Sequence, residues 1–155
     1  MGFDGVVAQA IMLIAVISAS TLLVLAFNGQ FSDSINTMAI KNEALEYQLK
    51  TDIQIEAVSY NETTGQINFY ARNTGDTILK HYQVNVYVNG VFIRNNSQTR
   101  EISLVEDTNI QNPNYWDPNE LINGTINQTL SVGSINELSL TTQYNTVESI
   151  DFSAN

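Results

Sequence analysis

An apolar segment without a charged residue runs from Val6 to Phe27, close to the start of the chain. It reads VVAQAIMLIAVISASTLLVLAF and is 22 residues long. As an α-helix rising about 1.5 Å per residue, it is long enough to cross the roughly 30 Å hydrocarbon core of a bilayer. A secretory signal usually has a basic start and a shorter apolar stretch, but no Lys or Arg precedes this one. The segment therefore predicts a transmembrane helix. Its apolar side chains include Val6, Ile11, Leu13, Ile14, Val16, Leu22, Leu23, Leu25 and Phe27.

The charges beside this segment leave its orientation open. Only the α-amino group and Asp4 precede it, and Asp33 comes before the first cation, Lys41. The chain has 16 acidic and 6 basic residues and no basic cluster, which argues against a nucleic-acid partner. Charged residues are only 14% of the chain, whereas asparagine occurs nineteen times, and there is no cysteine. This acidic, amide-rich composition favours an extracellular location for the C-terminal domain.

Four Asn-X-Ser/Thr sequons agree with that location. They begin at Asn61, Asn95, Asn123 and Asn127. Because Ser and Thr are common here, nineteen asparagines would produce roughly three sequons by chance. The sequons thus permit N-glycosylation without demanding it.

A helical pattern continues beyond the apolar segment and predicts a stalk over residues 28–50. Six residues at spacings of 4, 3, 4, 3 and 4 form a stripe of the a/d type: Phe31, Ile35, Met38, Asn42, Leu45 and Leu49. Asn28–Gly29 interrupts the helical pattern and could bend the helix. The stripe has two interpretations: it packs against its own β domain, or it pairs two subunits in a homodimer whose register Asn42 sets.

After residue 50 the apolar period changes from helical to two, which predicts strands. Strands are expected at 53–57, 66–73 and 99–105, and near 121–132, 135–143 and 146–152, with an irregular stretch at 107–120. Asn89–Gly90 between alternating apolar runs predicts a hairpin over 82–94. No helical crossovers separate the strands, so we expect a mainly β fold, an antiparallel β-sandwich. The predicted domains are a tail (1–5), a transmembrane helix (6–27), a stalk (28–50) and a β-sandwich (51–155).

Few residues point to catalysis or metal binding. His81, the only histidine, lies at the start of a predicted strand and is interpreted as a surface imidazole. No nucleophile motif or phosphate-binding loop is present, which favours a protein that is not an enzyme and needs no cofactor. The acids Glu106–Asp107 and Asp117 with Glu120 could bind Ca²⁺ but are more typical of turns and solvated surface.

Tyr115 and Trp116 lie inside the irregular stretch, and two interpretations apply to them. Tyr and Trp are favoured at interfaces, so this segment could be a partner-binding loop. Alternatively, Trp116 folds back as a lid on the sandwich.

The order of several short motifs resembles the archaellum (archaeal flagellum) accessory protein F family. The similar segments are the opening Met1-Gly2-Phe3 before an uncharged helix, Arg72-Asn73-Thr74-Gly75-Asp76-Thr77, Val86-Tyr87-Val88-Asn89-Gly90, and Trp116-Asp117-Pro118-Asn119-Glu120. In the last motif Asn119 stands where the family pattern has glycine. The resemblance covers essentially the whole chain.

This resemblance implies an archaellin-like β-sandwich outside a single-pass membrane anchor. It also implies that the domain contacts the S-layer and acts as a static element of the motor, beside the related archaellum G protein. The alternative within the wider type IV pilin superfamily is a filament subunit whose N-terminal helix packs in a filament core. Gly2-Phe3 lacks the basic residue and the following glutamate of a processed pilin-like signal, which favours the anchor. A solute-binding ectodomain would need a concave pocket that the strand pattern does not indicate.

Overall fold

The computed structural model describes residues 3–109 and 112–154, with Phe3 and Asp4 described by their backbone alone. The chain divides into two compact units, Met1–Glu43 and Ala44–Asn155. Helix α1 (Phe3–Lys50) provides the first unit, and its last residues belong to the second.

Helix α1 continues without interruption through Asn28–Gly29, the dipeptide at which the sequence pattern allows a bend. A glycine inside a helix costs about 1 kcal/mol relative to alanine, and this helix of 48 residues tolerates it. The hydroxyls of Ser20, Thr21 and Thr37 donate to the carbonyl oxygens four residues earlier. Their polar groups are thus satisfied within the helix. By length and composition, the part of α1 from Gly5 onward is long and apolar enough to cross a membrane.

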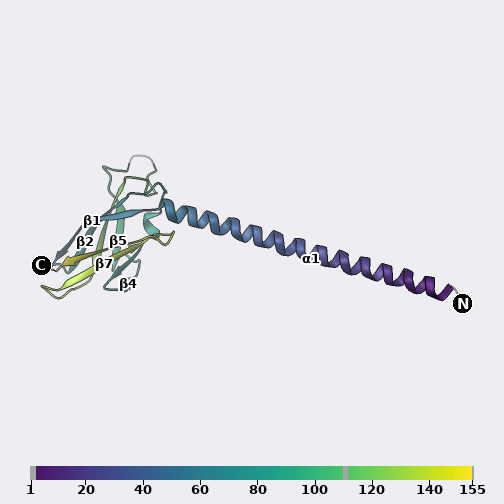
Figure 1. Ribbon diagram of the computed structural model, residues 1–155. Coiled ribbons are helices and arrows are strands. Elements are labelled where there is room, and N and C mark those ends of the chain that lie inside the picture. The colour runs from purple at the N-terminus through teal and green to yellow at the C-terminus, as the bar shows by residue number, and fades with distance from the viewer. Residues whose placement is uncertain (1–2, 110–111, 155) are drawn as a thin grey trace. The chain divides into compact units, whose positions relative to one another are not determined.

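The second unit is a sandwich of two four-stranded antiparallel sheets (Figure 1), which confirms the predicted fold class. The first sheet has the order β1 (Ile53–Asn61), β2 (Gln66–Asn73), β6 (Leu121–Asn127) and β5 (Arg100–Leu104). The second has the order β4 (Val91–Ile93), β3 (Asn85–Val88), β7 (Ile135–Thr141) and β8 (Val147–Ser153). Alternate residues of these strands face inward, and they build a core from Ile67, Phe69, Ala71, Val86, Val88, Ile122, Ile126, Leu138 and Leu140.

The hairpin at Asn89–Gly90 is present as predicted. Both turn residues have positive φ, 52° and 75°, as a two-residue hairpin turn requires. Its first strand begins later than expected, because His81–Gln83 form a 3₁₀ turn, η1, instead of a strand. Leu79 pairs with Trp116 in an isolated bridge, and the chain turns before it enters β3.

Candidate functional site

The loop after β2 fixes the C-terminal end of α1 to the sandwich. The backbone N–H groups of Thr74 and Gly75 donate to the carbonyl oxygen of Asp52 at 3.0 and 2.9 Å, and that of Asp76 donates to Lys50 O at 2.9 Å. The carbonyl group of the last helical residue is therefore satisfied by the sandwich. A Cβ on Gly75 would overlap this backbone, so the loop needs glycine here. We call residues 47–52, 73–77 and 142–146, all within the second unit, the neck.

The turn between β7 and β8 completes the neck from the other sheet. Thr51 is buried, its hydroxyl donates to Tyr47 O at 2.6 Å, and its carbonyl accepts a hydrogen bond from Thr146 Oγ1. The rings of Tyr47 and Tyr144 stack with centroids 4.9 Å apart and an interplanar angle of 8°. Thr142 Oγ1 accepts the N–H groups of Tyr144 and Thr146, which fixes the turn. Both sheets thus hold the helix end.

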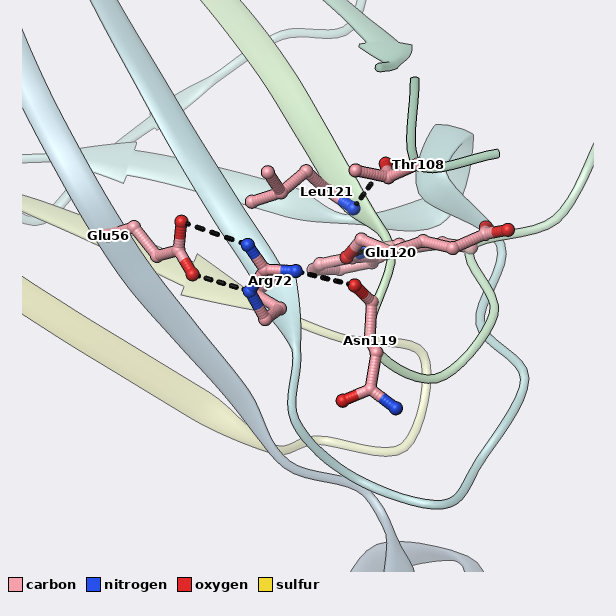
Figure 2. A network of polar contacts seen from close by, with 7 residues as sticks. Glu56, Arg72, Thr108, Asn119, Glu120 and Leu121 are labelled. Carbon is pink, nitrogen blue, oxygen red and sulfur yellow. Dashed lines mark hydrogen bonds and ion pairs between the residues drawn. The ribbon is translucent and has the colours of Figure 1, made fainter. Parts of the chain in front are cut away.

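Arg72 joins β1, β2 and the segment before β6 (Figure 2). Its Nε donates to Glu56 Oε1 at 2.5 Å, and its Nη1 donates to the carbonyl oxygen of Asn119 at 2.6 Å. The strand register shifts at Glu56, between Ile55 and Ala57, so this carboxylate is at a bulge. Because the ion pair is half-exposed, its main effect is to position the backbone, with a contribution to stability of about 1 kcal/mol or less.

Trp116 is fully buried and its Nε1 donates to Glu120 O at 2.7 Å. Its own carbonyl accepts from the side-chain amide of Asn73 at 3.0 Å, and that amide also donates to Thr77 O. Trp116 therefore tethers the long loop to the neck. The prediction that Trp116 is an exposed partner-binding residue is wrong, because its indole packs in the core. The alternative interpretation, in which Trp116 folds back as a lid on the sandwich, is correct. Tyr115 next to it remains 42% exposed.

The loop acids serve the local structure. Asp117 and Glu120 are buried. The Asp117 carboxylate accepts hydrogen bonds from the backbone and side chain of Asn112. Glu120 Oε2 accepts a hydrogen bond from the backbone N–H of Asp117. Glu106 and Asp107 are exposed. Within the described ranges, no group of three or more His, Cys, Asp or Glu residues is placed to hold a metal ion.

His81 is only partly a surface residue. It is half-buried in η1, and its Nδ1 has no hydrogen-bond partner among the described residues. Burial lowers the pKa of the His81 imidazole. Arg100 at the start of β5 is 3% exposed, and burial likewise lowers the pKa of its guanidinium. Arg100 was not expected in the core, although it falls on the inward side of an alternating strand.

Three of the four sequons lie on one surface, the outer face of the first sheet. Asn61, at the end of β1, is in one cross-strand row with Gln66 and Asn127, because Gln66 pairs with both. Asn123 alternates with buried residues of β6 and faces the same side. Its Oδ1 accepts from Ser103 Oγ on β5, and Asn127 Nδ2 donates to Gln98 O. Asn95 lies in the loop after β4 and is exposed. Glycosylation of these four residues stays a prediction.

The stalk stripe is not covered by the sandwich where both belong to one unit. Leu45 and Leu49 are 54% and 86% exposed, so packing of the stripe against its own β domain is wrong at these two positions. Phe31, Ile35 and Met38 are exposed, as is Asn42, and they lie in the other unit. Pairing with a second subunit stays a prediction.

A solvent-open groove lies beside the neck. We call it the neck groove; its lining residues are Tyr47, Lys50, Asp76, Thr77, Ile78, Lys80, Tyr115, Gln143 and Tyr144. Sequence periodicity could not reveal this groove, because its lining residues come from four separate segments. Tyr115, predicted as part of a partner-binding loop, is among them.

Sequence comparisons give limited information. No protein-family model matches the chain. An uncharacterised protein of Archaeoglobus fulgidus is 39% identical over 77 residues, which cover 49% of this chain and 47% of that protein. The chain thus spans about half the length of the curated relative it matches.

Solved structures with similar folds come from the archaellum. The archaeal flagellum of Methanospirillum hungatei strain JF1 aligns over 96% of this chain and 93% of its own, with a TM-score of 0.65 and 13% identity. The archaellum periplasmic stator protein FlaG from Sulfolobus acidocaldarius aligns over 66% of this chain and 99% of its own, with a TM-score of 0.51 and 19% identity. A structure of the FlaF and FlaG stator complex from the same organism has a TM-score of 0.50 and 18% identity, over 64% of this chain and 87% of its own. At these identities the likeness establishes a shared archaellin-like fold.

Proposed function

We propose that this chain is a membrane-anchored accessory protein of the archaellum, whose β-sandwich binds the S-layer and holds a static part of the motor. The observation that carries the proposal is the neck: hydrogen bonds to Lys50 and Asp52, and the stacked pair Tyr47–Tyr144, fix the helix end to both sheets. The fold shared with a protein described as a periplasmic stator supports it.

The physical reason is mechanical. A single membrane helix rotates and diffuses freely in a fluid bilayer, so it cannot resist torque alone. A domain that grips an immobile lattice can resist torque, provided that the connection between helix and domain does not turn. In the neck, rotation of the helix end about its axis would strain the hydrogen bond from Asp76 to Lys50 and separate the stacked rings of Tyr47 and Tyr144.

The proposal places the apolar part of α1 in the lipid and the sandwich outside the cell. Its partners are the S-layer protein, the related archaellum G protein and membrane lipid. The exposed stripe that ends at Leu45 and Leu49 is proposed to pair two copies of the chain. The fold shared with a chain of the FlaF and FlaG stator complex supports partnership with another archaellum protein. No catalytic role is included.

The test is cosedimentation of the purified full-length chain, reconstituted in lipid nanodiscs, with S-layer sheets from the source cells, between pH 3 and pH 7. We expect the protein to sediment with the sheets and to remain in solution without them. Empty nanodiscs are the control for lipid adhesion. Absence of the protein from the pellet at every pH would overturn the S-layer role.

A filament subunit is the second candidate, because the likeness to the archaeal flagellum covers nearly the whole chain, helix included. Mass spectrometry of the native protein and electron microscopy of cell-surface filaments distinguish the two. An intact N-terminus and a membrane-bound protein support the anchor. A cleaved N-terminus and its presence in purified filaments support the subunit.

A further inference from the structure

The neck groove is lined by exposed tyrosine and isoleucine side chains, and Tyr115 among them takes no part in the contacts that fix the neck. Tyr115 is 42% exposed, Tyr47 41% and Ile78 49%, although all three line a concavity. Exposed aromatic side chains gathered in a hollow are typical of ligand sites, because their large faces gain contact area at low cost in side-chain entropy.

The aromatic part of the groove is already in place. Tyr47 and Tyr144 are stacked, so each ring covers one face of the other. The exposed area of Tyr47 therefore lies on its remaining face and edge. Tyr47 is held by the helix, and Tyr144 by the turn that Thr142 fixes. A ligand would meet rings that need not be ordered, which reduces the entropy cost of binding.

The polar part offers single donors and acceptors of several kinds. Lys50 and Lys80 are cations and Asp76 is an anion. Gln143 and Thr77 are uncharged, and their side chains can both donate and accept hydrogen bonds. Lys50 Nζ is already bonded to Glu46 at 2.6 Å, which reduces its attraction for a further anion. Gln143 Oε1 accepts from the backbone N–H of Lys80. This bond orients the side-chain amide but does not use its N–H groups, which can donate to a ligand.

This combination fits one class of ligand. A phosphate or an acidic peptide prefers clustered cations or an arginine fork, and none of the nine lining residues is arginine. An apolar ligand would leave the charges of Lys80 and Asp76 desolvated without compensation. A sugar ring presents apolar C–H faces that pack on tyrosine and an edge of hydroxyls that both donate and accept.

We infer that the neck groove binds an oligosaccharide. Tyr115 and the Tyr47–Tyr144 pair contact the C–H faces of the sugar rings, and Asp76, Gln143 and Lys80 hydrogen-bond to its hydroxyls. The inference goes beyond the proposed function and does not depend on it. The glycan belongs either to another molecule or to a sequon of this chain.

The test uses the full-length chain in nanodiscs, because many detergents carry sugar headgroups. Saturation-transfer NMR with mannotetraose and with chitotetraose as probes measures binding. Tyr115→Ala is compared with Tyr70→Ala, a matched control that removes a tyrosine of similar exposure, 44%, from the outer face of β2. We expect at least one probe to bind, with a Kd weakened about three- to tenfold by Tyr115→Ala and unchanged by Tyr70→Ala.

Gln143→Ala is a second variant, on the turn at the opposite sheet, and is expected to weaken the same probe. A heptaglutamate peptide and inorganic phosphate serve as competing probes. No binding of either sugar, equal losses in the two tyrosine variants, or preferential binding of the peptide or phosphate would overturn the inference.

A comparison of two expression hosts identifies the source of the glycan. Protein purified from its native cells is compared with protein made in cells that lack N-glycosylation. If the ligand is carried by another molecule, the sugar probe binds both preparations equally. If a glycan of this chain fills the groove, the probe binds only the unglycosylated preparation. Both outcomes support the site.

Discussion

A Cβ on Gly75 would lie 2.5 Å from the carbonyl oxygen of Lys50, the last residue of the long helix. Atoms at that distance repel, so Gly75→Ala would push the loop after β2 away from the helix end. We expect the free energy of unfolding to fall by roughly 1–3 kcal/mol, the usual cost of inserting a methyl group where there is no room. Urea unfolding of the full-length chain, followed by the fluorescence of the buried Trp116, measures it.

Gly29→Ala is the matched control for this substitution. Gly29 lies in the interior of α1, and a Cβ there meets nothing within 4 Å. Alanine favours the helix by about 1 kcal/mol over glycine, so this variant is expected to be as stable as the parent or more so. If Gly75→Ala were equally harmless, the close approach at the neck would be disproved.

Asn119 has a φ of +68°, a backbone conformation that β-branched residues rarely adopt. Its carbonyl oxygen accepts from Arg72, so the backbone here is also tied to the first sheet. We expect Asn119→Gly to stay within about 0.5 kcal/mol of the parent and Asn119→Val to lose roughly 1–2 kcal/mol. The urea midpoints of the two variants measure the difference.

Asn114→Val tests whether the loss comes from the backbone conformation. Asn114 is exposed in the same loop, and its φ is not positive. A valine there should change the free energy of unfolding by no more than about 0.5 kcal/mol. Equal losses at positions 114 and 119 would contradict the conformational explanation. Asparagine suits this position, because among residues other than glycine it adopts positive φ comparatively often.

Much of the fold was predictable because it depends on local periodicity. The 22 uncharged residues of 6–27 predict a helix, and alternation with Asn89–Gly90 predicts a hairpin whatever the rest of the chain does. The burial of Trp116 could not be derived in this way, because it depends on Asn73 and Leu79, which are remote in sequence. The neck groove could not be predicted from the sequence for the same reason. Its residues share no period and meet only when both sheets contact the helix end.

Gly124 on β6 faces the ring of Phe69 on β2, and a Cβ at this position would overlap that ring. Gly124→Ala is therefore expected to cost roughly 1–3 kcal/mol through overpacking of the core. Replacing the ring by a smaller side chain should relieve part of this cost. In the Phe69→Leu background, the same glycine substitution is expected to be less harmful. A double-mutant cycle on urea unfolding measures the coupling, and strict additivity would contradict the contact.

The half-buried imidazole of His81 predicts a pH dependence of stability. Burial holds the pKa of the imidazole below its ordinary value of about 6.5 in the folded state, so the unfolded chain binds a proton first as the pH falls. The free energy of unfolding should therefore decrease as the pH drops below the unfolded value near 6.5, and the decrease ends below the folded pKa. We expect urea midpoints to fall from pH 7 to pH 5, and to fall less in His81→Gln, which cannot titrate.

Apart from residue 81, the parent and His81→Gln carry the same charged side chains. The difference between the two profiles therefore isolates the histidine. Tyr82→Phe is the matched control: Tyr82 is the exposed neighbour of His81 in η1, its ring contacts the imidazole edge-on, and phenylalanine keeps that ring while His81 is unchanged. This variant should keep the parent's slope. Identical slopes in the parent and in His81→Gln would mean that the imidazole titrates alike in the folded and unfolded chain, and that its burial in η1 has no electrostatic consequence.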